Sequence, residues 1–194
     1  AYGERWARHW LDTARYSDTT GDTTSQADRV SEYKYPYAWT FREWVINAIN
    51  RDMPYDQFIL NQLAADKIPN NPKENLAAMG FLTVGQRFTQ KEDIINDRID
   101  VIGRGFLGLT VACARCHDHK FDPVSTADYY ALRGILISSV EPKQLPLIAG
   151  DPRAPSFLKF QQELAQMEQI AYDAFFKVQR DYSDKYRKNA EMAF

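Results

Sequence analysis

The two cysteines of the chain lie three positions apart, at Cys113 and Cys116, and His117 follows the second one directly. The spacing C-x-x-C-H is that of c-type haem attachment, because two thiols on one turn of helix reach the two vinyl groups of a single porphyrin. The histidine that follows then lies under the iron as its proximal ligand. The motif therefore predicts one covalently bound haem c, held by Cys113 and Cys116 and ligated by His117.

Two other chemistries fit a pair of cysteines at this spacing. A disulfide or thioredoxin-like redox pair usually opens a helix after a strand, and no strand pattern precedes Cys113. A zinc site could use the two thiols with His117 or His119. Structural zinc normally takes its ligands from two separated pairs, however, and the chain has no second cysteine pair. Haem is the favoured interpretation, with the other two kept as alternatives.

The two remaining histidines are candidates for further contacts with the cofactor. His119 lies two residues beyond His117, so its own turn should hold it off the opposite haem face; we expect it to meet a haem propionate, or a second metal or haem. His9, flanked by Trp6 and Trp10 on one predicted helix, is the candidate distal iron ligand. A buried, hydrogen-bonded histidine is the alternative interpretation of His9.

The sixth iron ligand decides the chemistry. His9 would give a His/His iron, whereas Met53 or Met79 would give a His/Met iron, although methionines usually fill cores. Either pair favours transfer of single electrons. An iron with an open face favours peroxide or small-ligand chemistry instead, with Arg8, Arg15 or Tyr16 as distal donors. Electron transfer is the favoured function; the alternatives are a haem enzyme, the redox partner of an appended catalytic domain, and a structural module without haem.

The elements that must position these residues read as helices throughout. Apolar residues recur at three- and four-residue steps, and no strand pattern interrupts them. Asp52 is the expected N-cap of one helix, and residues 125–128 (STAD) resemble a capping box. The pattern predicts an all-α fold with helices over residues 2–16, 36–49, 53–63, 75–81, 92–112, 126–136 and from 156 to near the C-terminus.

The predicted helix over 92–112 delivers the chain directly into Cys113 and contains three glycines, Gly103, Gly105 and Gly108. Each glycine costs about 1 kcal/mol relative to alanine inside a helix. Such residues indicate that something comes very close to the backbone. A neighbouring helix is favoured slightly over the face of the porphyrin.

The polar segment 17–35 is predicted to be a long loop. Its acidic residues Asp18, Asp22 and Asp28 could take a calcium ion, but their spacing matches no EF-hand. A solvated loop is therefore favoured.

The pattern changes near residue 146. We predict an irregular helical haem domain over 1–145, a proline-rich linker over 146–155 and a long helical or coiled-coil arm over 156–194. The arm repeats apolar residues in a three-four alternation, so it needs a partner, either a further domain in missing sequence or another subunit. Its apolar positions are Phe157, Phe160, Leu164, Met167, Ala171, Ala174 and Val178.

Composition excludes some classes of function. The 24 Lys and Arg residues nearly balance the 26 Asp and Glu residues, and no basic strip indicates nucleic-acid binding. No apolar stretch approaches the roughly 18 residues that a membrane span needs. The chain begins at Ala1 without an initiator methionine or a signal core, which indicates a processed end or, as we favour, a piece of a longer chain.

Three blocks of sequence resemble the planctomycete-type cytochrome c domain found in large, multidomain secreted proteins. They are residues 3–12 (GERWARHWLD), 50–58 (NRDMPYDQF) and 105–123 (GFLGLTVACARCHDHKFDP), and the likeness covers roughly residues 1–145. The resemblance implies a haem domain that is joined to a further uncharacterised domain. Together with covalent haem, it implies a periplasmic, secreted or cell-surface location and an unidentified redox partner protein. The activity of that family is not established.

Overall fold

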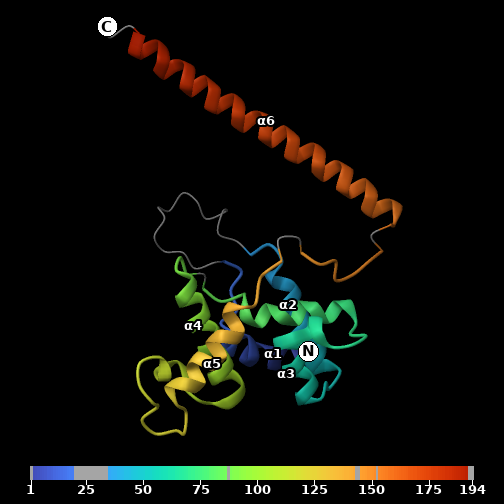
Figure 1. Ribbon diagram of the computed structural model, residues 1–194. Coiled ribbons are helices and arrows are strands. Elements are labelled where there is room, and N and C mark those ends of the chain that lie inside the picture. Colours follow the sequence, from blue (N-terminus) through green and yellow to red (C-terminus); the bar gives the residue numbers. More distant parts are fainter. Residues whose placement is uncertain (1, 20–34, 87, 143–144, 152, 192–194) are drawn as a thin grey trace. The chain divides into compact units, whose positions relative to one another are not determined.

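The computed structural model describes residues 2–19, 35–86, 88–142, 145–151 and 153–191. Every regular element in those ranges is helical, which confirms the all-α prediction (Figure 1). The chain divides into two units, Ala1–Ile148 and Ala149–Phe194, and the division falls within the predicted linker. The candidate haem residues all belong to the first unit.

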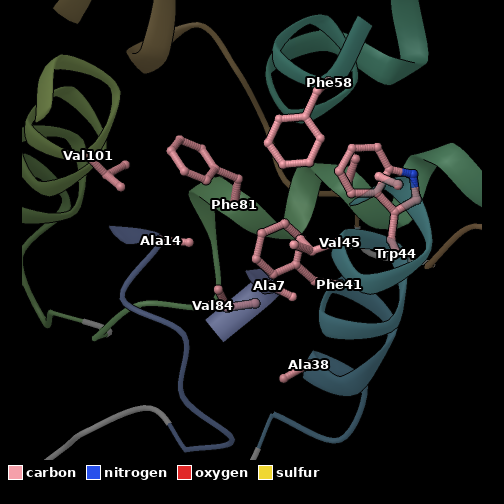
Figure 2. Packing of buried hydrophobic residues seen from close by; sticks show 12 residues of the cluster. Ala7, Ala14, Ala38, Phe41, Trp44, Val45, Phe58, Phe81, Val84 and Val101 are labelled. Atoms are coloured by element: carbon pink, nitrogen blue, oxygen red, sulfur yellow. The ribbon is translucent and has the colours of Figure 1, made fainter. Parts of the chain in front are cut away.

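The N-terminal half of the first unit is built on one core cluster. Helix α1 (Tyr2–Thr13) packs on α2 (Ala38–Asn50), and the 3-10 helix η3 (Lys73–Leu82) packs on both α2 and α3 (Tyr55–Ala64), which continues into the short 3-10 helix η2 (Ala65–Lys67). Figure 2 shows apolar side chains gathered between these helices, together with Val101 from α4 (Lys91–Ile102). The cluster is formed by Ala7, Ala14, Ala38, Phe41, Trp44, Val45, Ala48, Phe58, Ala78, Phe81, Val84 and Val101.

Aromatic rings connect this cluster to the segment that precedes the cysteines. The Trp10 ring stacks on Phe81 with centroids 5.7 Å apart, and Phe81 lies 4.7 Å from Phe106. The Trp10 indole N–H donates to Oε1 of the fully buried Gln62 at 2.6 Å. Phe106, which precedes Cys113 by seven residues, thus anchors the chain in the first core cluster.

A second core cluster supports the motif itself. It joins α4 (Lys91–Ile102), the 3-10 helix η5 (Val111–Arg115) and α5 (Thr126–Ile137). The predicted capping box at the start of α5 is confirmed: Ser125 Oγ accepts from the Asp128 amide at 3.2 Å, and Asp128 Oδ2 accepts from the Ser125 amide at 2.8 Å. The buried members of the cluster are Ile95, Ile99, Val111, Ala114, Tyr129 and Leu136.

The prediction of a single helix over 92–112 is wrong. Helix α4 ends at Ile102, the π-helix η4 (Gly103–Leu107) follows, and Gly108 has a left-handed backbone with φ of 67°. A Cβ on Gly103 would lie 2.8 Å from the Leu109 carbonyl oxygen, because the chain folds back on itself there. At Gly105 the close neighbours are Phe81 of η3 and a methyl group of Thr13 in α1. The backbone approach indicated by these two glycines is therefore made by protein groups.

Three further boundaries differ from the prediction. Helix α1 ends at Thr13, and Arg15 turns the chain with φ of 58°. Asp52 is not an N-cap: its amide donates to the Ile49 carbonyl, its φ is 51°, and it terminates α2, while Pro54 precedes α3 without a side-chain cap. The predicted helix over 75–81 is the 3-10 helix η3.

In the predicted loop 17–35, Asp22 and Asp28 lie outside the described residues, and Asp18 accepts a hydrogen bond from the Tyr16 hydroxyl at 2.7 Å.

The second unit contains α6 (Pro155–Glu191), a helix of 37 residues, which confirms the predicted long C-terminal helix. Its apolar side chains are exposed, among them Phe160, Leu164, Met167, Ile170, Phe175 and Val178. The partner expected for this arm stays a prediction. No helix in the described part of the chain is long and apolar enough to cross a membrane.

Candidate haem-attachment loop

Helix η5 and the residue that follows it carry the two cysteines, both of them exposed. Val111 and Ala114 are buried in the second core cluster, with 3% and 0% of their surface exposed. Cys113 lies within η5, and Cys116 follows directly as its C-cap residue, with φ of −111° and ψ of −27°. Both cysteines are exposed and free. The structure therefore leaves both predicted attachment residues accessible.

His117 follows on the same exposed segment. Its Nδ1 lies 2.8 Å from the Asp118 carbonyl oxygen. A carbonyl only accepts hydrogen bonds, so Nδ1 carries the proton and Nε2 keeps its lone pair when the ring is neutral. Nε2 has no hydrogen bond to the part of the protein that the structure describes. The tautomer and exposure of His117 are those of an imidazole able to bind a metal through Nε2.

Asp118 fixes this imidazole to the rest of the domain. Its Oδ1 accepts from the Thr126 amide, at the start of α5, at 2.8 Å. The hydrogen bonds from the Thr126 backbone and side chain lower the pKa of the Asp118 carboxyl. The ionised form is thereby favoured at the N-terminus of the helix, where negative charge is stabilised. The backbone carbonyl that orients His117 thus belongs to a residue anchored on α5.

His119 lies under the loop with only 8% of its side chain exposed. Its Nδ1 accepts the amide hydrogens of Phe121, at 3.3 Å, and Asp122, at 2.9 Å, and is therefore unprotonated. Nε2 then carries the proton and donates to Thr110 Oγ1 at 2.9 Å. The Asp122 carboxylate lies 3.2 Å from Nδ1. Because the ring is neutral in this tautomer, the two side chains do not form an ion pair. Both ring nitrogens of His119 thus form hydrogen bonds within the protein. The expected contact of His119 with a cofactor stays a prediction.

The predicted distal residues lie on elements of the first core cluster. His9 is exposed on α1, with its ring 5.5 Å from that of Trp6, and no hydrogen bond or ring contact between described residues joins it to the cysteine motif. Met53 packs against the first core cluster. The role of His9 as sixth ligand stays a prediction.

The proposed distal donors Arg15 and Tyr16 have partners of their own. Arg15 Nη2 lies 2.7 Å from Asp97 Oδ2, beside a cavity of about 10 Å³, which is room for one water molecule. Burial of the Asp97 carboxyl raises its pKa, and this effect is larger than the lowering caused by the Arg15 guanidinium. Burial and the hydrogen bond to Asp18 raise the pKa of Tyr16 to about 12.

Two residues of the loop were missed from the sequence, Thr110 and Asp118. Neither belongs to the C-x-x-C-H spacing, and their roles depend on which atoms the folded loop brings together. Among the described residues, no group of three or more His, Cys, Asp or Glu side chains is arranged to hold a metal ion by itself. A haem would need only one protein nitrogen at its iron, in addition to the two thiols.

The fold and the loop define an all-α protein with a surface-exposed C-x-x-C-H segment. Residues 1–141 match the family model PSCyt2, described as a protein of unknown function (DUF1549), and the chain belongs to this family. The match ends shortly after α5 and does not include α6. No curated protein and no solved structure matches the chain. Since the family description gives no function, the resemblance to a cytochrome c domain stays a prediction.

Proposed function

We propose that the first unit binds one haem c covalently through Cys113 and Cys116, with His117 as the axial iron ligand, and transfers single electrons outside the cytoplasm. The observation that carries the proposal is the joint exposure of two free cysteines, one in η5 and one at its C-cap, and of an imidazole with an available Nε2 directly after them. These are the donors that c-type attachment requires, in the required order.

The thiols bind the cofactor by addition. Cys113 and Cys116 would each hold the haem through a thioether: the sulfur would bond to one carbon of a vinyl group, the vinyl double bond would become a single bond, and the thiol hydrogen would go to the other vinyl carbon. No electrons would enter or leave, so the thiols would have to be reduced beforehand. When bound, the haem supplies an iron that cycles between the ferrous and ferric states.

The surroundings of the loop favour electron transfer. The donor residues lie at the surface, where a redox partner protein can approach closely. The Nδ1–H of His117 donates to a backbone carbonyl, which fixes the ring orientation and increases its strength as a ligand. If the sixth position is open, the alternative of a haem enzyme gains support; if His9 occupies it, electron transfer does. Covalent haem c attachment is the basis for the proposed extracytoplasmic location.

The test is the intact mass of the chain after production together with a haem-attachment machinery. We expect the wild-type chain to gain the mass of one haem that survives denaturation. Cys113→Ser and Cys116→Ser should each retain at most one thioether, and the double variant should gain none. A wild-type chain that gains no haem and instead loses its two thiol hydrogens would overturn the proposal in favour of a disulfide.

A further inference from the structure

His119 connects the two ends of the segment that carries the haem residues. Its Nε2–H donates to Thr110, which immediately precedes η5, and its Nδ1 accepts from the amides of Phe121 and Asp122, after the motif. Its own amide donates to the Val124 carbonyl at 2.8 Å. Every residue assigned to haem attachment lies between these contacts.

Other anchors of this segment act on only part of it. Val111 and Ala114 hold η5 in the second core cluster, and Asp118 is tied to α5. None of these contacts joins the entrance of the segment to its exit. The bond between His119 and Thr110 does so across nine residues. Because only 8% of the His119 side chain is exposed, loss of these partners would leave largely buried ring nitrogens without hydrogen bonds.

We propose that His119 is a positioning residue for haem attachment. Its bonds to Thr110, Phe121 and Asp122, here called the His119 clasp, hold Cys113, Cys116 and His117 in their relative places before the cofactor arrives. The inference rests on the proposed function for its consequence, although the clasp itself is a property of the haem-free chain. A positioning role also differs from that of a ligand of iron or propionate. A ligand role would require the His119 imidazole to leave these partners.

Limited trypsin digestion of the haem-free chain tests the clasp. The Lys120–Phe121 bond lies inside it, since the Phe121 amide donates to His119. Thr110→Val keeps the side-chain volume and removes the hydroxyl, whereas Thr110→Ser keeps the hydroxyl. We expect cleavage after Lys120 to be about fivefold faster in Thr110→Val and near the wild-type rate in Thr110→Ser. Cleavage after Arg153, in the second unit, is the internal control and should not change.

The haem-loaded protein gives a second readout. The α-band of the pyridine haemochrome reports how many vinyl groups have become thioethers, which loss of stability alone does not change. We expect Thr110→Val and His119→Leu to raise the share of singly attached haem. Thr110→Ser and His119→Gln should keep the double attachment of the wild type. His119→Gln keeps one acceptor and one donor and is thus the conservative variant.

The outcomes separate the two proposals. A wild-type chain that takes up no haem contradicts the proposed function, while the digestion experiment still decides whether the clasp exists. Thr110→Val that equals the wild type in both readouts overturns the clasp. A changed haem reduction potential in His119→Leu, with Thr110→Val unchanged in digestion and attachment, would instead make His119 a direct contact of the cofactor.

Discussion

The fold-back of the chain after α4 predicts that Gly103→Ala destabilises the first unit. Gly103 already has helical dihedral angles, φ −59° and ψ −53°, so alanine is not excluded by its backbone. Its Cβ would, however, lie 2.8 Å from the Leu109 carbonyl oxygen and 2.9 Å from Val111 Cγ2. Leu109 cannot retreat easily, because its amide donates to the Gly103 carbonyl at 3.1 Å.

The size of the effect follows from two opposing contributions. Overpacking of this kind costs about 1–3 kcal/mol. The helical preference of alanine over glycine returns up to about 1 kcal/mol. We therefore expect the free energy of unfolding to fall by about 1–2 kcal/mol, which corresponds to a Tm lower by roughly 4 °C for a unit of this size.

Gly134→Ala is the matched control. Gly134 lies in α5, and a Cβ there would meet nothing within 4 Å. The same substitution should then stabilise the unit by about 0.5–1 kcal/mol. Urea unfolding followed by tryptophan fluorescence measures both variants in the first unit, because all four tryptophans lie before residue 45. A Gly103→Ala chain as stable as Gly134→Ala would refute the fold-back.

Two further predictions concern a buried amide and a helix cap. Gln62→Leu removes the acceptor of the Trp10 indole, and the urea unfolding free energy should fall by about 2 kcal/mol; an unchanged value would show that this bond adds no stability. Because hydrogen bonds from Ser125 lower the pKa of Asp128, the folded state gains stability above the ordinary aspartate value, near pH 4, and loses it as the pH falls. Asp128→Asn should flatten the acid side of the Tm–pH curve; a curve parallel to wild type would contradict this contribution.

Features encoded by neighbouring residues could be predicted from the sequence. The capping box at Ser125 needs only residues within one turn, and it is present. The long arm has a repeating apolar pattern that identifies it as a helix without knowledge of its partner. The C-x-x-C-H spacing likewise located the candidate site, and the structure places both cysteines and His117 on exposed backbone.

Features decided by tertiary contacts could not be predicted. Apolar residues continue at helical steps through Phe106 and Leu109, so the pattern does not reveal that the helix ends at Ile102. Phe106 packs in the first core cluster and Val111 in the second, which requires the chain to turn between them. Asp52 has the side chain of an N-cap, yet aspartate also tolerates the left-handed conformation that terminates α2.

The hydrogen bonds of the His119 side chain could not be predicted from the sequence for a similar reason. From its place two residues beyond His117, His119 is expected to meet a haem propionate, or a second metal or haem. In the folded chain, one imidazole has a free Nε2 at the surface and the other is buried with both nitrogens bonded. The difference depends on Thr110, which lies on the other side of the cysteines.

The central claim is tested most directly by the visible spectrum of the purified chain, oxidised and reduced, followed by haem staining on a denaturing gel. Covalent attachment through Cys113 and Cys116 predicts a sharp α-band on reduction and a stain that stays with the protein band. The Cys113→Ser, Cys116→Ser double variant, produced in parallel, should lose the stain. A colourless wild-type protein from a host that attaches haem c to a control cytochrome would contradict the claim.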